Sequence, residues 1–256
     1  MHIDIIGSGS PLLLMHGWAM HGGVFMPLVE RLRHRFQCWI VDLPGHGNSS
    51  EDAGADLSHS VERLLAQAPA GTRWLGWSLG GQLALDAALQ APHEVGGVAM
   101  IASSPCFVRR ADWPHGVDDS VFTGFASELK RDYAATIERF LALEVHGDDA
   151  ARSELRSLRA MWASRPAPRP EVLNIGLNWL AHRDYRARLS ELSVPSLWLA
   201  GARDRLVPPE AMRWASEASG GSYAQWPAGH APFLAHGDAI AAAIVSWAQG
   251  EESSES

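Results

Sequence analysis

The sequence WLGWSLGG at residues 74–81 decides the fold of this chain, because it places Ser78 in a Gly-x-Ser-x-Gly motif at 76–80. An apolar stretch precedes the serine, and an Ala- and Leu-rich helical stretch at 79–89 follows it. A serine between strand and helix sits on a tight turn with its hydroxyl outward, and the flanking glycines leave room for that backbone. The helix also presents free N–H groups, beginning with Leu79, to a developing negative charge. The motif therefore predicts a serine nucleophile.

The composition predicts one sizeable domain that could carry an insertion. The chain has 256 residues, of which 46% are hydrophobic. It lacks the ~20 continuous apolar residues that a membrane-spanning helix needs, and it lacks the features of a signal peptide. Its two cysteines, Cys38 and Cys106, do not predict a disulfide. We therefore expect a cytoplasmic protein. The net charge of −8 argues against nucleic-acid binding, so neither nucleic acid nor a membrane is an expected partner.

Short apolar runs alternate with helical patterns at both ends of the chain. The predicted strands are 12–15, 38–41, 73–76, 98–102, 196–200 and 222–226, and the predicted helices are 24–33, 57–68, 79–89, 210–218 and 239–249. Buried strands separated by helices predict an α/β fold with a mostly parallel sheet and helices on both faces.

The middle of the chain differs from both ends. Residues 108–188 carry a charge balance of +1 against −9 for the remainder, and they read as helices at 121–133, 135–144 and 150–163. A proline cluster at 166–170 marks a break between helices. We expect an α/β core of residues 1–107 and 189–250, an inserted helical cap of residues 108–188 over the carboxyl ends of the strands, and a flexible acidic tail at 251–256.

A serine nucleophile needs a base and an orienting carboxylate, which in this sheet type follow in the order Ser, Asp, His on loops after later strands. Asp204 follows the strand at 196–200, and His230 follows the strand at 222–226. We therefore predict a catalytic triad of Ser78, Asp204 and His230.

Other residues compete for these roles. Asp42 begins the turn Asp-Leu-Pro-Gly-His-Gly, where an aspartate commonly bonds its own turn backbone. Asp86 lies too far along a helix, and His236 precedes the last helix. Neither the histidines nor the two cysteines form a metal pattern, and the first strand is followed by neither a phosphate loop nor a dinucleotide fingerprint, so we expect no metal and no cofactor.

An oxyanion hole needs a second backbone donor besides Leu79. The predicted strand at 12–15 is followed by His16-Gly17-Trp18, so the N–H of Trp18 is the candidate. Its indole ring could pack in the core at the same time, because the donor is the backbone.

The triad loops, His16-Gly17-Trp18 and the motif around Ser78 resemble the α/β-hydrolase superfamily. Three longer segments, 74–81, 102–107 and Glu138-Arg139-Phe140-Leu141-Ala142-Leu143, resemble the BioH-type pimeloyl-[acyl-carrier protein] methyl ester esterases of biotin synthesis. The resemblance covers nearly the whole chain, including the cap.

The resemblance implies a serine carboxylesterase in which Ser78 is nucleophile, His230 is base and then acid, and Asp204 orients the histidine. It also implies a substrate carried on acyl-carrier protein, besides small-molecule esters. The implied substrate-binding residues are Trp18, Ser78, Leu79, Phe140, Leu141, Ala142, Leu143, Glu144 and His230.

The family is expected to meet its acidic carrier protein with cap arginines, and Arg139, Arg152 and Arg156 match such positions. Arg152 and Arg156 are four residues apart and share one helix face. Ala135 departs from an expected basic residue, which Arg131 could replace, and the acidic Glu144 departs from the pattern as well. On charge alone, a solvated helix surface is the favoured interpretation of these arginines, and only the resemblance favours a contact with the carrier protein. We expect a monomer.

Other functions of the same fold stay open at this point. A short-chain carboxylesterase of broad specificity or a carbon–carbon bond hydrolase would use the same triad and a helical cap. A dehalogenase or epoxide hydrolase is disfavoured, because those enzymes place an aspartate where this chain has Ser78. A receptor-like member that binds a ligand without turnover is a further alternative, and the intact triad argues against it.

Overall fold

The computed structural model describes residues 1–50, 56–146 and 150–250. The strands are β1 (His2–Gly7), β2 (Ser10–Met15), β3 (Phe36–Asp42), β4 (Thr72–Trp77), β5 (Val95–Ile101), β6 (Ser196–Gly201) and β7 (Ser222–Trp226). The α-helices are α1 (Met26–Leu32), α2 (Ser58–Gln67), α3 (Leu79–Gln90), α4 (Asp119–Arg131), α5 (Tyr133–Glu144), α6 (Ala151–Trp162), α7 (Pro170–His182), α8 (Pro209–Ser219), α9 (Pro232–Ala235) and α10 (Gly237–Gln249). The predicted tail at 251–256 lies outside the described residues.

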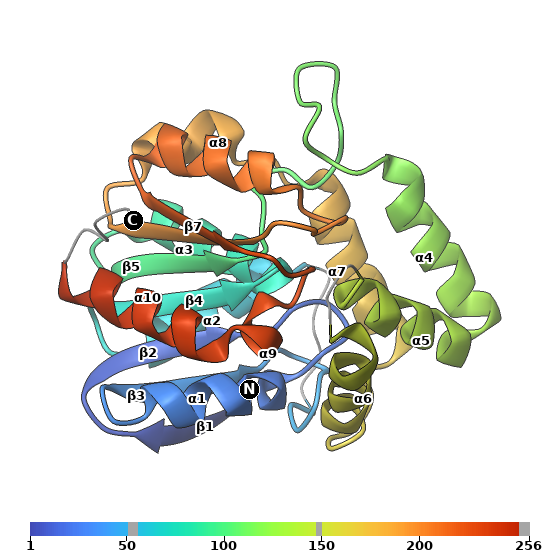
Figure 1. Ribbon diagram of the computed structural model, residues 1–256, viewed down its shortest axis with the longest axis horizontal. Coiled ribbons are helices and arrows are strands. Elements are labelled where there is room, and N and C mark those ends of the chain that lie inside the picture. The colour runs from blue at the N-terminus through green and yellow to red at the C-terminus, as the bar shows by residue number, and fades with distance from the viewer. Residues whose placement is uncertain (51–55, 147–149, 251–256) are drawn as a thin grey trace.

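The seven strands form one sheet in the order β1-β3-β2-β4-β5-β6-β7 (Figure 1). Only β1 pairs antiparallel, with β3, and the other neighbours are parallel. Leu12 to Leu14 in β2 and Val98 to Ile101 in β5 are almost wholly buried, as expected for strands covered on both faces. The predicted α/β fold with a mostly parallel sheet is confirmed.

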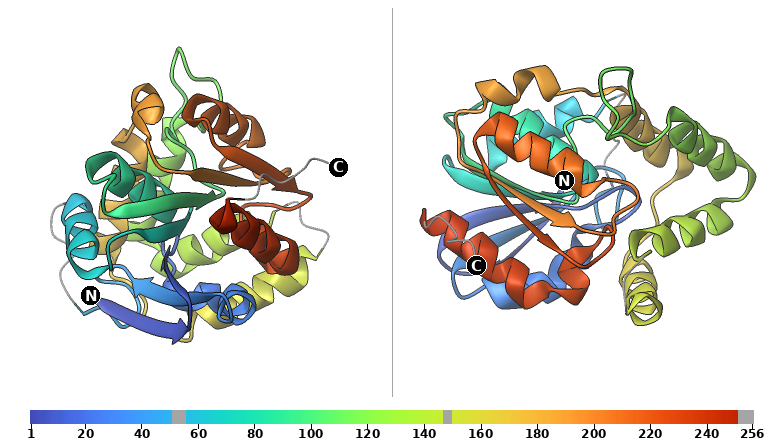
Figure 2. Two further views of the ribbon diagram at one scale, coloured as in Figure 1. Left: turned by 90° about the vertical axis from the view of Figure 1, so that its left-hand side faces the viewer. Right: turned by 45° about the horizontal axis from the view of Figure 1, so that its top comes forward.

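Helices cover both faces of this sheet. Helix α1 packs against α10, while α2 packs against α3 on the opposite face (Figure 2, left). All six predicted strands and the predicted core helices are present, with ends that differ by a few residues. The helix predicted at 24–33 starts later, because Gly22–Phe25 form a short 3-10 helix and Pro27 stands in the first turn of α1.

Helices α4 to α7 form a separate layer at one end of the sheet (Figure 1; Figure 2, right). Their amphipathic sequences turn Phe122, Phe125, Phe140 and Leu177 inward. Helix α7 and strand β1 were not predicted. The proline cluster obscured the start of α7, whose first residue is Pro170, a residue favoured in a first helical turn.

Cys38 and Cys106 are both buried and free. Within the described ranges, none of the helices is long and apolar enough to cross a membrane.

Candidate active site

Ser78 lies on a sharp turn between β4 and α3. Its backbone has φ 54° and ψ −115°, a conformation that residues other than glycine rarely adopt. A Cβ atom on Gly76 would lie 2.1 Å from the carbonyl group of Gly80, and one on Gly80 would lie 2.1 Å from the carbonyl oxygen of Met15. Both glycines are therefore required by close backbone approach. The carbonyl of Ser78 accepts a 2.7 Å hydrogen bond from the Ser103 hydroxyl, which ties the turn to the end of β5.

The structure brings Ser78, His230 and Asp204 into one hydrogen-bonded chain. The Ser78 Oγ lies 2.8 Å from His230 Nε2, and His230 Nδ1 lies 2.7 Å from Asp204 Oδ2. The other carboxylate oxygen of Asp204 accepts hydrogen bonds from the backbone N–H groups of Leu206 and Val207, at 2.8 and 3.0 Å. Asp204 is thus held by its own loop, and it fixes the histidine with Nε2 toward the serine.

Burial and charge act in opposite directions on His230. Burial opposes the imidazolium, but the charges of Asp204 and Glu144 and the hydrogen bond to Asp204 outweigh it and raise the pKa of His230 to about 9. The Trp77 indole donates a 2.7 Å hydrogen bond to the His230 carbonyl, so the loop that carries the base is held from β4. The geometry suits transfer of a proton from the Ser78 hydroxyl to the imidazole.

The two predicted oxyanion donors belong to segments that lie close to the serine. Leu79 is the first residue of α3, and Trp18 follows Gly17, on which a Cβ would lie 3.4 Å from that of Ser78. The N–H groups of Trp18 and Leu79 make no hydrogen bond within the described part of the chain, so both are available to a bound oxygen. Their shared role as an oxyanion hole stays a prediction.

The rival Asp42 serves a different purpose. Its carboxylate accepts hydrogen bonds from the backbone N–H groups of Gly22 and Asn48, each at 2.7 Å, and from Arg165 at 2.8 Å. It therefore bonds its own loop, as predicted, and it also binds an arginine from between α6 and α7.

Among the described residues, no group of three or more His, Cys, Asp or Glu side chains is arranged to hold a metal ion.

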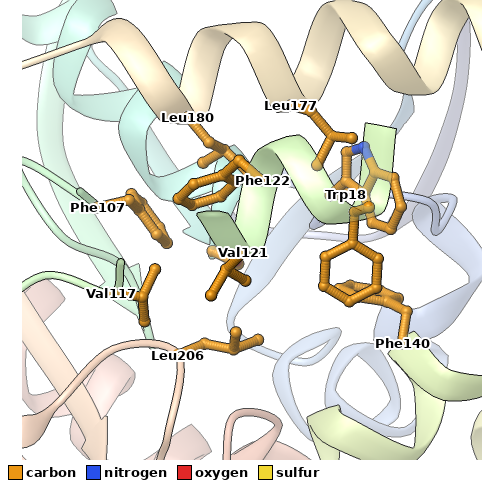
Figure 3. A pocket seen from close by; sticks show the side chains of 11 residues that line it. Trp18, Phe107, Val117, Val121, Phe122, Phe140, Leu177, Leu180 and Leu206 are labelled. Carbon is orange, nitrogen blue, oxygen red and sulfur yellow. The ribbon is translucent and has the colours of Figure 1, made fainter. Parts of the chain in front are cut away.

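An apolar pocket has Ser78 among its lining residues, and Figure 3 shows the apolar side chains that surround it. The space between its walls, part of which is open to solvent, is about 400 Å³. The lining residues come from the core and from the α4, α5 and α7 region, and they are Trp18, Ser78, Phe107, Val117, Val121, Phe122, Phe125, Phe140, Leu177, Leu180 and Leu206. Such a wall suits a hydrocarbon chain and offers almost no partner to a charged group.

Trp18 joins the core to the helical layer. Its indole N–H donates a 2.8 Å hydrogen bond to the Leu173 carbonyl in α7, and its ring meets that of Phe140 edge to face at 4.7 Å. A Cβ on Gly176 would lie 2.8 Å from the Trp18 ring, so α7 rests directly on it. The predicted packing of the Trp18 ring is confirmed, and its packing partners named here belong to helices α5 and α7.

The predicted substrate segment at 140–144 does not lie on one surface. Phe140 lines the pocket beside Ser78, and Leu141 is fully buried. Ala142 and Leu143 line a separate open groove between α4 and α5, which shares Val121 and Phe125 with the pocket. Glu144 is buried with a carboxylate oxygen 3.9 Å from His230 Nε2. Only Phe140 of this segment lines the pocket itself, and the substrate contacts of the others stay predictions.

The three predicted carrier-protein contacts lie on two helices. Arg152 and Arg156 are exposed on α6, and the described residues include no ion-pair partner for either. Arg139 on α5 donates a 2.7 Å hydrogen bond to Glu128 and lies over the Phe125 ring. Arg131, proposed to replace a basic residue at Ala135, lines the same hollow as Ala135 and Arg139 although it belongs to α4.

Sequence reasoning missed three features of this site. Leu177 and Leu180 line the pocket from α7, a helix that was not predicted. Arg165 reaches Asp42, and Glu144 reaches His230, from distant parts of the chain. The only available signal was the unexpected acid at position 144 in the family pattern.

The sequence of this chain is similar to those of known proteins. The family model of the alpha/beta hydrolase fold matches residues 10–235. A pimeloyl-[acyl-carrier protein] methyl ester esterase of Xanthomonas oryzae pv. oryzae (strain MAFF 311018) is 51% identical, over 95% of this chain and 97% of the relative. Proteins of the same name from Stenotrophomonas maltophilia (strain K279a) and Xylella fastidiosa (strain 9a5c) are 50% and 47% identical, each over 95% of this chain, covering 95% and 97% of the respective relative.

Solved structures support the fold. An esterase from Exiguobacterium antarcticum superposes with a TM-score of 0.87 at 21% identity, over 97% of this chain and 95% of the other. A bromoperoxidase from Bacillus anthracis superposes with a TM-score of 0.86 at 20% identity, over 96% and 94%. Because an esterase and a bromoperoxidase match equally well, the fold alone does not select the reaction.

Proposed function

We propose a function for this chain from one premise: it belongs to the pimeloyl-[acyl-carrier protein] methyl ester esterase family, within the alpha/beta hydrolase fold. The chain is a serine carboxylesterase that hydrolyses the methyl ester of pimeloyl-[acyl-carrier protein], in biotin biosynthesis, to the free acid and methanol. Besides the similarity to known esterases, one structural observation supports this proposal. Hydrogen bonds join Ser78 through His230 to Asp204, and Ser78 lines an apolar pocket.

The first step is acylation of Ser78. Its hydroxyl oxygen attacks the ester carbonyl while His230 Nε2 takes the hydroxyl proton, and Asp204 stabilises the imidazolium. The N–H groups of Leu79 and Trp18 stabilise the negative charge on the carbonyl oxygen. When the tetrahedral intermediate collapses, His230 returns the proton to the departing methoxy oxygen, and methanol leaves.

The second step releases the acid. A water molecule gives a proton to His230 and attacks the acyl-enzyme carbonyl, and the collapse of this second intermediate returns the proton to the Ser78 oxygen. The apolar wall formed by residues such as Phe122, Phe140 and Leu180 suits the methylene chain of the substrate.

The cap is proposed to choose the carrier. We treat residues 108–188 as this cap and the remainder up to residue 250 as the hydrolase core. Arg139, Arg152 and Arg156 are proposed to meet the acidic carrier protein, since a near-neutral cap on an acidic body repels an acidic partner least. We also propose that the protein acts as a monomer in the cytoplasm.

The test compares two substrates. We expect kcat/KM for pimeloyl methyl ester on acyl-carrier protein to exceed that for free short-chain methyl esters by about tenfold or more, because only the carrier-bound ester engages the cap. Equal or better turnover of the free esters would establish a broad carboxylesterase instead. An absence of turnover together with an absence of organophosphate labelling at Ser78 would favour a receptor-like protein.

A further inference from the structure

Glu144 is the last residue of α5, and its carboxyl group is buried. The side chain is 0% exposed, and neither carboxyl oxygen has a partner within the described residues. A buried acid is ordinarily paired, because an unpaired one costs free energy of folding. The mechanism proposed for the ester hydrolysis assigns no role to this group.

The backbone of Glu144 is hydrogen-bonded to the loop that carries His230. Its carbonyl accepts hydrogen bonds from the N–H groups of His230 and Ala231, at 2.8 and 3.2 Å. The carboxyl of Glu144 then lies 3.9 Å from His230 Nε2, the same nitrogen that faces the Ser78 hydroxyl. Helix α5 thus places a second carboxyl group, besides that of Asp204, near the imidazole of His230. This carboxyl group lies near Nε2, the nitrogen that exchanges a proton with Ser78.

Few charges surround this pair. Among the described residues, the charged groups that act on Glu144 and His230 are each other and Asp204, which comes from the loop after β6. The turn between β4 and α3 contributes the uncharged Ser78 hydroxyl, and His146, two residues beyond Glu144, is exposed. Burial raises the pKa of Glu144 to about 8, against the opposing charge of His230 and with the support of Asp204.

We propose that Glu144 is a positioning residue that stabilises the protonated form of His230 from the side opposite Asp204. The inference rests on the proposed esterase function, and it adds a residue that acts through the base. Above about pH 8, where Glu144 is ionised, its carboxylate 3.9 Å from Nε2 favours the imidazolium that forms when Ser78 loses its proton. The same carboxylate makes His230 a stronger base and keeps it protonated to higher pH.

These two effects have opposite consequences for the rate. A stronger base removes the serine proton faster, so the rate plateau at alkaline pH is higher with Glu144 than without it. A base that holds its proton more tightly becomes available only at higher pH, so the acid limb of the pH profile moves upward. Removal of the charge should therefore produce two pH profiles that cross.

The first experiment measures kcat/KM against pH for the wild type and for Glu144→Gln, which keeps the shape and removes the charge. We expect the acid limb of Glu144→Gln to lie about one to two pH units lower. Its alkaline plateau should be about three- to tenfold lower. Glu144→Asp, which keeps the charge, should restore most of the wild-type limb. Glu138→Gln is the matched control, because Glu138 belongs to the same helix but is exposed and paired with Arg159.

An acid limb of Glu144→Gln that coincides with that of the wild type would overturn the inference, as would a uniform fall in rate at every pH. The wild type supplies a test that needs no folded variant: its acid limb should lie above the ordinary histidine value of ~6.5, and a limb at or below that value contradicts the proposal.

A second readout separates this inference from the proposed substrate. The pH dependence of organophosphate labelling of Ser78 reports the availability of His230 without any ester. A shifted labelling profile in Glu144→Gln supports the role of Glu144 even if the carrier-bound ester proves a poor substrate. An unshifted labelling profile alongside good turnover of that ester rejects the role of Glu144 and leaves the proposed function intact.

Discussion

The core and the cap hold their important residues in different ways. In the core, Ser78, His230 and Asp204 are buried and joined by hydrogen bonds of 2.7 to 2.8 Å. On the cap surface, Arg152 and Arg156 are exposed. Buried, bonded groups have one arrangement, whereas exposed side chains keep many rotamers. In the proposed function, the core therefore carries the chemistry, and the cap surface is left to select the ester.

The boundary between the two regions is polar as well as apolar. Arg165, between α6 and α7, donates to Asp42 at 2.8 Å and to Asp4 at 2.7 Å. His21 Nε2 lies 2.8 Å from the Met161 carbonyl oxygen at the end of α6. These contacts fasten one side of the cap to the sheet, so the cap helices are held by more than the contact with Trp18.

The largest expected effect tests the core. Ser78→Ala should lower kcat/KM by about 10⁴-fold or more, because the nucleophile acts as a unit with its base. Steady-state rates measure the effect, and thermal unfolding checks that the fold persists. Ser120→Ala, an exposed serine at the edge of α4, is the control and should retain activity. A Ser78→Ala enzyme with full esterase activity would contradict the proposed mechanism.

The next effect tests the boundary. Arg165→Met should lower the free energy of unfolding by about 3 kcal/mol, because it leaves the fully buried Asp42 without its charged partner. Arg159→Met is the matched cap control, since its ion pair with Glu138 is about half exposed. Loss of such an exposed pair should cost less than about 1 kcal/mol. Urea unfolding at pH 7 measures the free energy of unfolding of both variants. Equal losses would show that the ion pair of Arg165 with Asp42 does not hold the cap to the core.

A smaller effect tests the cap surface. The double variant Arg152→Glu/Arg156→Glu should lower kcat/KM on the carrier-bound ester by about 10- to 100-fold, because it places negative charge against an acidic partner. Turnover of free esters should change less than about twofold. Arg33→Glu/Arg35→Glu makes the same charge change on the core and should leave the carrier-bound ester unaffected. A similar loss in both double variants would reflect net charge and would reject a cap docking site.

The smallest effect concerns the acid stability of the core. Burial lowers the pKa of His16 to about 3 and that of His46 to about 4. The unfolded chain titrates near 6.5 and therefore binds more protons than the native state between these values, so stability falls as pH falls below ~6.5. His46→Gln should recover about 1 to 2 kcal/mol of the stability that the wild type loses between pH 7 and pH 5.

Urea unfolding at the two pH values measures the acid effect. The exposed His59, changed to Gln, is the control and should leave the pH dependence as it is in the wild type. A His46→Gln protein that loses as much stability as the wild type between pH 7 and pH 5 would assign the acid sensitivity to other groups.

The parts of the site that could be predicted follow local rules. The turn at Ser78 needs small residues on both sides, and Gly76 and Gly80 are there because backbone atoms lie 2.1 Å from where a Cβ would be. Asp204 and His230 could be placed because loops after parallel strands meet at one edge of the sheet. Helix α7 could not be predicted from the prolines before it. They mark the end of one helix, but either a helix or a loop can follow them.

The sequence by itself determined the fold, the three residues of the proposed triad and the family, since short motifs and strand order specify local geometry. Only the tertiary structure decided that Glu144 faces His230, that Arg165 pairs with Asp42, and that α7 forms the wall over Trp18. Each of these contacts joins residues far apart in the chain. Their spacing in sequence carries no information about distance, because it is the packing of the cap on the sheet that brings them together.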